Sequence, residues 1–308
     1  MVEPETAGDP MSARKWRRSS LRALSQALGA KISHTTVGRV LKDLDYSLKA
    51  NVKRLTGAPH PDRDTQFAYI EHQKQAFREA GLPIISVDTK KKELIGRFKN
   101  SGRRWCQTAD EVNAHDFEQD ALGKAVPYGV YDVTNNRGYV YVGKTADTPQ
   151  FAVEQIAAWW QTFGCHDFPA AKRLLILCDA GGSNGYRPRL WKQQLQELLA
   201  DQLGLEVTVC HYPTGASKWN PVEHRLFGPI SVNWAAEPLL SFDKTLALIR
   251  GTVTATGLSV EAFLVDKVYA TGLKVTAAVM KALNLIHHTV CPNWNYTIRP
   301  RSMDTVST

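Results

Sequence analysis

A short apolar run that ends in an acid constrains this chain more than any other stretch. Residues 84–87 are Ile-Ile-Ser-Val, and Asp88 follows them directly. A run this short after a Gly-Leu-Pro turn is typical of a buried strand. In open α/β sheets ligands bind at the carboxyl ends of the strands, which is where Asp88 would lie. A carboxylate there costs desolvation energy unless a cation accompanies it.

A second run of the same kind lies further along the chain. Residues 174–178 are Leu-Leu-Ile-Leu-Cys, and Asp179 follows them. If the two strands are parallel neighbours, Asp88 and Asp179 share one edge of the sheet. The next predicted strand, residues 205–210, leads to a helix that carries Glu223 in its first turn. We therefore expect Glu223 over the same edge.

Three carboxylates crowded together cannot all stay ionised without a cation. Oxygen ligands favour Mg²⁺ or Mn²⁺, and two such ions suit phosphodiester chemistry. Each acid also has a simpler interpretation. Asp88 could pair with a neighbouring lysine, and Asp179 could form an Asx turn. Glu223 could complete a capping box in a helix that Asn220 caps.

The formal charge of +8 is concentrated in two stretches. Residues 1–60 carry 11 basic and 5 acidic side chains, and residues 89–104 carry 7 and 1. The remainder is slightly acidic, so the two stretches indicate a polyanion partner, most simply double-stranded DNA. The alternative is two solvated loops. The side chains expected to contact DNA in the second stretch are Lys90, Lys91, Lys92, Arg103 and Arg104.

Two short helices are predicted near the N-terminus. Leucines recur at helical spacing between Ser20 and Gly29, and Ser33 is placed to cap a second helix over residues 34–44. Two helices around a Gly-containing turn are a helix-turn-helix candidate, although a plain helical hairpin has the same pattern. A recognition helix meets DNA near its N-terminus. The side chains expected on that face are His34, Thr35, Thr36, Arg39 and Lys42.

The remaining features are those of a soluble protein. No run of about 18 apolar residues occurs, so no membrane span is expected. The N-terminus is polar and acidic, unlike a signal peptide. The 5 cysteines are widely spaced without a Cys-x-x-Cys pair. They indicate a reduced protein of the cytoplasm, associated with the nucleoid if DNA is its partner.

The order of these signals predicts an α/β chain in several segments. Each boundary follows a change in composition or periodicity. The expected segments are a disordered basic leader at residues 1–18, a helix-turn-helix domain and linker at 19–62, a catalytic core at 63–237 with a surface insertion at 91–126, and a C-terminal helical extension at 238–308.

Several motifs resemble those of the ISAzo-type insertion-sequence transposases, which belong to the DDE group. The resemblance extends roughly from Ser20 to Ile298, and its motifs are long enough to be specific. The motifs are SHTTVGRVL at residues 33–41, ISVDTKKKEL at 85–94, DAGGSNG at 179–185, SKWNPVEHRLF at 217–227 and WNYTI at 294–298.

The resemblance implies an RNase H-like mixed sheet flanked by helices, preceded by a small helix-turn-helix domain. It also implies cleavage at the ends of a mobile element to free a 3′-hydroxyl, then attack of that hydroxyl on target DNA by an oligomer of the chain. The residues it implicates are Asp88, Asp179 and Glu223 as catalytic ligands of two Mg²⁺ or Mn²⁺ ions, with Asn184, Lys218 and Asn220 in support.

Two other functions stay open at this point. The chain could be a DNA-binding regulator derived from a transposase, or an RNase H-like nuclease that hydrolyses DNA without strand transfer. A regulator needs no convergent acids, so the acids favour an enzyme. Terminal inverted repeats beside the gene would separate a transposase from a nuclease.

Overall fold

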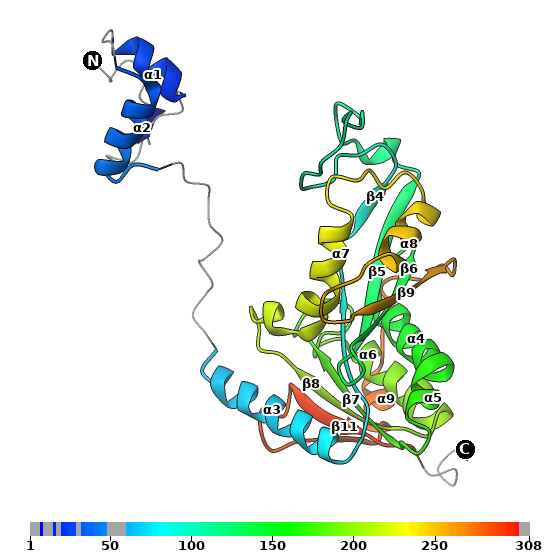
Figure 1. The fold of residues 1–308 in the computed structure, drawn as a ribbon. Coiled ribbons are helices and arrows are strands. Elements are labelled where there is room, and N and C mark those ends of the chain that lie inside the picture. The colour runs from blue at the N-terminus through cyan, green and yellow to red at the C-terminus, as the bar shows by residue number, and fades with distance from the viewer. Residues whose placement is uncertain (1–6, 9–14, 17–19, 29–31, 48–59, 302–308) are drawn as a thin grey trace. The chain divides into compact units, whose positions relative to one another are not determined.

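The computed structural model describes residues 7–8, 15–16, 20–28, 32–47 and 60–301. The chain forms two compact units, residues 1–55 and residues 56–308 (Figure 1). Among the described residues, no helix has both the length and the apolar character that crossing a membrane requires.

The first unit contains the two helices predicted for a helix-turn-helix. α1 (Leu21–Ala27) begins after Ser20, and α2 (His34–Asp43) begins after Ser33. The hydroxyl of each serine accepts a hydrogen bond of 3.2 Å from a backbone N–H in the first turn. Each cap therefore satisfies one of the amides that a helix start leaves unpaired. The predicted start of both helices is confirmed.

The leader is described only in part. Ala7–Gly8 (β1) and Lys15–Trp16 (β2) pair as short antiparallel strands. The prediction of disorder is wrong for these four residues, because the two strands bond each other's backbone. The rest of residues 1–18 and the linker at 48–59 lie outside the described residues.

The second unit is built on a nine-stranded mixed sheet in the order β10-β11-β8-β7-β3-β5-β6-β9, with β4 paired to β5. β3, β7 and β8 are parallel, β5 is antiparallel to both β3 and β6, and β9 is parallel to β6. The order β6-β5-β3-β7-β8 with β5 alone reversed is the predicted RNase H-like sheet. Its strands are β3 (Ile84–Thr89), β4 (Glu93–Ile95), β5 (Gly123–Asp132), β6 (Arg137–Gly143), β7 (Arg173–Cys178), β8 (Glu206–His211), β9 (Ser259–Val265), β10 (Leu285–His287) and β11 (Asn295–Ile298).

Helices cover both faces of this sheet (Figure 1). Several contain wider π-helical turns, and one helix runs on from η6 into α7. The helical segments are α3 (Arg63–Glu79), η2 (Glu118–Asp120), α4 (Pro149–Trp159), η3 (Trp160–Gly164), α5 (Cys165–Asp167), α6 (Arg189–Gln194), η4 (Leu195–Gln202), η5 (Ser217–Trp219), η6 (Glu223–Phe227), α7 (Gly228–Asn233), α8 (Phe242–Arg250) and α9 (Ala277–Lys281).

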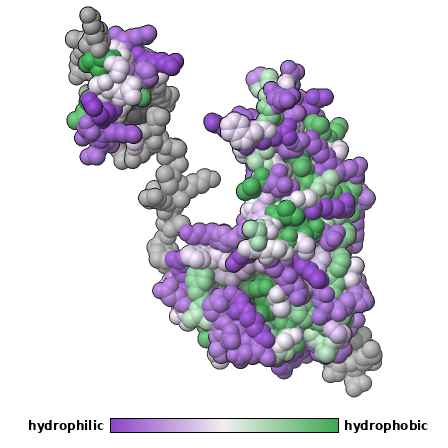
Figure 2. Space-filling view, in the orientation of Figure 1, coloured by the Kyte–Doolittle hydropathy of each residue, from purple (hydrophilic) through white to green (hydrophobic). Residues whose placement is uncertain are grey.

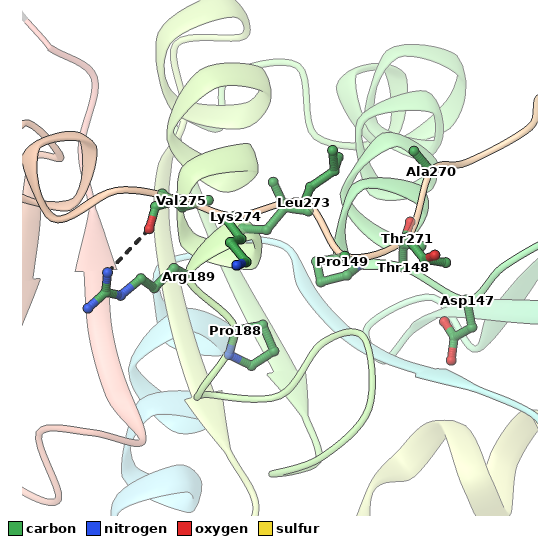
Figure 3. A pocket seen from close by; sticks show the side chains of 12 residues that line it. Asp147, Thr148, Pro149, Pro188, Arg189, Ala270, Thr271, Leu273, Lys274 and Val275 are labelled. Carbon is green, nitrogen blue, oxygen red and sulfur yellow. Dashed lines mark hydrogen bonds between the residues drawn. The ribbon is translucent and has the colours of Figure 1, made fainter.

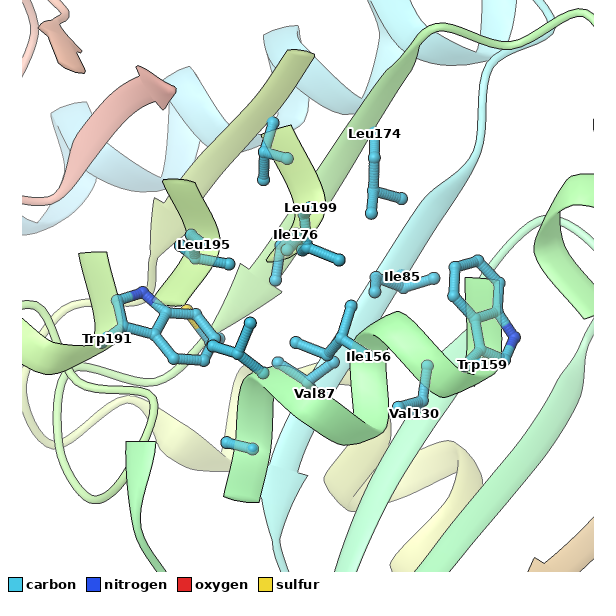
Figure 4. Close-up of a cluster of buried hydrophobic side chains, with 14 of the residues drawn as sticks. Ile85, Val87, Val130, Ile156, Trp159, Leu174, Ile176, Trp191, Leu195 and Leu199 are labelled. Atoms are coloured by element: carbon cyan, nitrogen blue, oxygen red, sulfur yellow. The ribbon is translucent and has the colours of Figure 1, made fainter. Parts of the chain in front are cut away.

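The core follows from the alternation of side chains along β3. Ile85 and Val87 point to the face that α4, α6 and η4 cover, and they pack there with Ile156 and Trp191 (Figure 4). Ile84 points to the opposite face and packs under α3. Because successive strand residues alternate between faces, both faces of β3 must be apolar to lie between two layers of helices.

The stretch after Pro238 was expected to be a helical extension. α8 and α9 are helices there, but the expectation is wrong for β9, β10 and β11. β9 lengthens one side of the sheet beside β6, and β11 extends the other side beside β8. β9 has seven residues, whereas β11 (Asn295–Ile298) has only four, all buried and without alternation. Their partners are strands far away in sequence, so local pattern alone did not identify them.

The insertion predicted at residues 91–126 is also wrong at both ends. β4 lies inside it, and β5 begins at Gly123, before the predicted end of the insertion. β4 pairs with the early part of β5, Glu93 opposite Ala125. This added ladder satisfies backbone groups that a surface loop would leave to water. The loop between the two strands is correspondingly shorter than predicted.

Candidate active site

The first two predicted acids lie on neighbouring strands. β3 and β7 are parallel, and Val87 is the register partner of Cys178. Asp88 and Asp179 follow these two residues, so their side chains share the carboxyl edge of the sheet. Both residues are half-buried. The sheet therefore brings together the pair that the sequence predicted.

The third acid reaches this edge through Asn220. Its side-chain amide donates to the carbonyl oxygen of Val87 at 3.1 Å, and its oxygen accepts from the hydroxyl of Ser86 at 2.5 Å. The backbone N–H of Val222 donates to the same hydroxyl at 2.9 Å. These bonds fix the start of the helix to β3, and Glu223 follows at once.

The predicted role of Asn220 as a helix cap is wrong. Its side chain is fully buried and bonded to β3 rather than to its own helix. A buried amide must find partners, and Ser86 and Val87 supply them inside the sheet. The carboxyl group of Glu223 shares a hydrogen bond with Asp88, which is not the contact that a capping box makes.

A glycine allows the helix to come this close. Gly129 is the register partner of Asp88 in β5, and a methyl group added to it would lie 2.6 Å from the ring of Phe227. Phe227 is buried on the helix that begins beside Glu223. Because no side chain separates β5 from this helix, Glu223 stays near Asp88.

Burial raises the proton affinity of all three acids, and neighbouring carboxylates add to it at Asp88 and Asp179. Burial raises the pKa of Asp88, and the charges of Asp179 and Glu223 raise it further. Burial also raises the pKa of Asp179, and the charge of Glu223 adds to it. Burial raises the pKa of Glu223, while a hydrogen bond to Asp88 and the charge of Lys90 oppose the rise. Crowded carboxylates of this kind favour either a shared proton or a cation.

The loop after β7 holds Asp179 in place. The N–H of Gly181 and the side-chain amide of Asn184 both donate to its Oδ1, each at 3.2 Å. Asn184 is fully buried. The Asx turn weighed for Asp179 is thus present, and it orients a carboxylate that still faces its neighbours.

Behind Asp179 lies a buried chain of hydrogen bonds. His211 donates from Nδ1 to the backbone carbonyl of Asp179 at 2.8 Å. Its Nε2 therefore accepts from the hydroxyl of Tyr296 at 3.1 Å, and Trp191 donates to that hydroxyl at 2.9 Å. Burial lowers the pKa of His211 to about 4, so the ring is neutral at pH 7. The chain ties β8, β11 and α6 to the strand end that carries Asp179.

The amino-acid sequence matches the family model described as the Rhodopirellula transposase DDE domain over residues 1–300. The chain belongs to this family. The predicted resemblance to DDE-group transposases is therefore confirmed. Among curated proteins, no sequence matches this member of the DDE family.

Among solved structures, this DDE-family chain is similar to the Mos1 transposase. A Mos1 paired-end complex with the left transposon end matches with a TM-score of 0.44 and 14% identity, covering 73% of this chain and 64% of that chain. The Mos1 paired-end complexes with Mn and with Mg give TM-scores of 0.43 and 0.44 at 14% and 15% identity, with the same coverage. The chain thus spans 64% of the length of these Mos1 chains.

The donor chemistry of the site fits a divalent metal ion. Asp88, Asp179 and Glu223 offer only carboxylate oxygens, which Mg²⁺ and Mn²⁺ prefer. A cation would also relieve the repulsion that raises the pKa values of these acids. In the part of the chain that the structure describes, no three His, Cys, Asp or Glu side chains are already grouped to hold a metal.

A fourth acid, Asp147, was missed by the sequence analysis. Its carboxylate accepts from the hydroxyl of Thr89 at 3.0 Å, and its charge raises the pKa of Asp88. It follows β6, which runs parallel with β3 and ends at the same edge of the sheet. Asp147 stands just before Thr148 and Pro149, a sequence typical of an ordinary helix start. For this reason the sequence pattern did not indicate a functional acid there. One signal could have identified it. β5 and β6 form a hairpin directly after the strand that leads to Asp88, and an acid that follows such a hairpin returns to the same edge of the sheet.

The predicted DNA-contacting residues of the second basic stretch have different environments. Lys90 is buried, pairs with Glu93 at 3.1 Å and lies over the ring of Trp234. Arg104 is bonded to Asp110 and Glu237. Both side chains form ion pairs within the protein, which weakens the prediction that they contact DNA. The residues of this set with exposed side chains are Lys91, Lys92, Arg103 and Arg104.

The predicted recognition face of α2 is mostly exposed. His34, Thr35, Arg39 and Lys42 are open to solvent, whereas Thr36 is half-buried and bonded to the capping serine. These side chains of the first unit are therefore accessible to a partner molecule. Their contact with DNA stays a prediction.

A pocket of about 540 Å³ lies beside Asp147 (Figure 3). Asp147 and Pro149 line one side and Arg189 the other, and the segment 270–275 crosses between them. Arg189 donates to the backbone carbonyl of Val275 at 3.2 Å, which holds this segment. Lys274 adds a second cation to the pocket wall. Since Asp147 also contacts Thr89, the pocket adjoins the candidate acids.

Proposed function

We propose that this chain is a DDE transposase that cuts DNA at the ends of a mobile element and joins the freed 3′-hydroxyl to target DNA. The observation that carries the proposal is the meeting of Asp88, Asp179 and Glu223 at one sheet edge in a member of this family. Hydrolysis and joining are both attacks of an oxygen on a phosphorus atom, so one set of residues can serve both steps.

In the first step, water attacks the phosphorus at the element end. The new P–O bond forms as the bond to the 3′-oxygen breaks, and that oxygen takes up a proton to become the 3′-hydroxyl. In the second step this hydroxyl attacks a target phosphorus and loses its proton, while the bond from that phosphorus to the target strand's 3′-oxygen breaks and that oxygen takes up a proton. The P–O bond formed replaces the P–O bond broken, so neither step needs an oxidant, a reductant or a high-energy cofactor.

The residues of the chain position the carboxylates for this chemistry. Asn184 and the N–H of Gly181 orient Asp179, and Asn220 fixes the helix start that carries Glu223. Two Mg²⁺ or Mn²⁺ ions bound by the three acids would activate the attacking oxygen and stabilise the leaving oxygen. The exposed Lys91, Lys92 and Arg103, together with α2 of the first unit, would hold the phosphate backbone.

The test is a cleavage assay on DNA that carries the inverted repeats flanking the gene. We expect nicks at the repeat ends with Mg²⁺ or Mn²⁺, and none with EDTA or with Glu223→Gln. Joined products should form with a target plasmid and should disappear when the cut strand ends in a dideoxynucleotide.

The same assay tests the other candidate functions. Nicking without any joined product would favour an RNase H-like nuclease. Sequence-specific binding with neither nicking nor joining would favour a regulator. Assembly of several copies on DNA and a cytoplasmic location stay predictions.

A further inference from the structure

We propose that Trp219 is a stacking platform for an unpaired DNA base beside the candidate acids. This proposal deepens the proposed function, because it names how the substrate strand would be held at that site. Trp219 is 52% exposed, although tryptophan usually buries most of its ring. An exposed aromatic face next to a phosphodiester site is the feature that single-strand-binding proteins use.

The position of Trp219 is fixed by its neighbours in sequence. Its backbone N–H donates to the carbonyl of Ala216 at 2.8 Å in the short turn η5. The next residue, Asn220, is bonded to Val87 and Ser86 just before Asp88. Trp219 therefore stands one residue from the anchor that aligns Glu223. A base stacked on this ring would lie close to the phosphate under attack.

Two further aromatic rings, those of Phe67 and Tyr212, connect Trp219 to the protein core. Its ring meets Phe67 of α3 edge-on, with centroids 6.0 Å apart and an interplanar angle of 77°. Phe67 in turn lies 5.9 Å from Tyr212, which is buried. The N–H of Tyr212 donates to the carbonyl of Cys178 at 2.8 Å, directly before Asp179. The outermost ring is thus held by a column of aromatic side chains that begins at the strand ends.

Two cations accompany the column. The Nζ of Lys218 lies 5.4 Å from the centroid of the Trp219 ring, and the guanidinium of Arg63 lies 5.5 Å from that of Phe67. Within the described residues neither cation forms an ion pair with a carboxylate. Lys218 is exposed and lies over the Trp219 ring, so it can exchange this ring contact for a phosphate of a bound nucleotide, and Arg63 adds positive charge beside Phe67.

The aromatic ring and the two cations together indicate which kind of ligand binds at Trp219. A protein or lipid partner of purely apolar character would gain nothing from Lys218 and Arg63. A paired base is stacked on both faces and leaves none for Trp219. An unpaired nucleotide has a free base face that can stack on Trp219. Its neighbouring phosphates can contact the two cations.

The test uses two DNA probes of the same sequence, a fork and a full duplex, each with 2-aminopurine beside the fork junction. Binding is measured in EDTA, so that no cutting occurs. We expect the wild-type chain to quench 2-aminopurine in the fork and much less in the duplex. Trp219→Ala should lose this quenching and bind the fork roughly 5- to 100-fold more weakly, which is the range for loss of one base–aromatic stack.

The matched control is Trp105→Ala, because Trp105 is a second exposed tryptophan. It should behave as wild type with both probes. Trp219→Phe keeps an aromatic face and should retain most of the quenching. Thermal unfolding of each variant checks that the fold is intact.

The proposal is overturned if Trp219→Ala quenches the fork like wild type. It is also overturned if that variant weakens fork and duplex equally, since Trp219 would then be a general DNA contact. These readouts need no catalysis. A chain that never cuts DNA but shows Trp219-dependent quenching would therefore contradict the proposed function and leave the platform standing.

Discussion

At the scale of single residues, the site is defined by carboxylates that repel one another in a half-buried setting. Burial and mutual charge raise the pKa values of Asp88 and Asp179. Backbone or amide N–H groups donate to Asp88 and Asp179 and hold them in place. The site therefore concentrates negative charge at one edge of the sheet, an arrangement that favours binding of positive charge.

Asp179→Asn tests this arrangement. The amide keeps the shape of the side chain but removes a charge that a divalent ion would need. We expect cleavage to fall by at least roughly 100-fold, as when other groups that stabilise charge in a transition state are removed. DNA affinity should be unchanged or higher, because a negative charge near phosphate is lost.

The measurement pairs a cleavage assay with a DNA-binding titration. Asp116→Asn serves as the control, since Asp116 is exposed in the loop between β4 and β5. Cleavage by Asp179→Asn at the wild-type rate would remove Asp179 from the site.

His211 should make stability depend on pH. Its pKa is about 4 in the folded chain because burial disfavours the charged ring, and about 6.5 when unfolded. Between these values the unfolded chain binds a proton that the folded chain refuses, so stability falls as the pH falls from about 6.5 towards 4. The full loss is up to about 3 kcal/mol.

Urea unfolding of wild type and His211→Gln at pH 7 and pH 5 measures this loss. The glutamine cannot titrate, so other acids cancel in the difference between the two proteins. The stability of wild type relative to the variant should fall from pH 7 to pH 5. A difference that does not change with pH would mean that the folded chain accepts the proton.

At the scale of elements, the approach of one helix to one strand assembles the site. Gly129 lies opposite Asp88, and the helix that starts at Pro221 packs directly on it through Phe227. The helix carries Glu223, so its distance from β5 sets how close the third acid comes. A packing contact thereby controls the spacing of charged groups.

Gly129→Ala should disturb this spacing. The added methyl group would meet the buried ring of Phe227, and such overpacking costs about 1–3 kcal/mol of stability. Cleavage should fall more than DNA binding does, because Glu223 is displaced while the basic surfaces are not. Chemical unfolding and a cleavage assay measure the two effects.

The double variant Gly129→Ala with Phe227→Leu provides the control. The smaller side chain makes room for the methyl group, so part of the stability and activity should return. If the single variant cuts DNA normally, close packing at Gly129 is not required for the site.

At the scale of the whole molecule, two units divide the tasks that the proposal assigns. The first unit presents an exposed polar face on α2, and the second carries the acids. In Figure 2 hydrophilic residues predominate over the visible face of the second unit. Recognition of DNA and the chemistry on it can then be separated by substitution.

Arg39→Glu should weaken DNA binding without changing the fold of the second unit. Loss of one phosphate contact lowers the slope of log affinity against log salt by about 1. Binding titrations at several salt concentrations measure it. Arg22→Glu makes the same charge change on α1 and should have a smaller effect. Equal losses from both variants would indicate attraction by net charge rather than recognition by α2.

The sequence by itself determined the parts of the fold that local pattern encodes. The short apolar runs before Asp88 and Asp179 identified buried strands, because runs of this length are typical of strands rather than helices. The acids after them and the motif around Glu223 identified the candidate site. Ser20 and Ser33 marked the starts of α1 and α2 through their caps.

Only the tertiary structure decided what depends on distant partners. β9 and β11 are strands because β6 and β8 offer free edges, which no local pattern announces. Asn220 serves the sheet rather than its own helix because burial forces its amide to bond with β3. Asp147 joins the acids because β6 ends at the same edge as β3. Local preference cannot specify such contacts, since their energy comes from groups far apart in the chain.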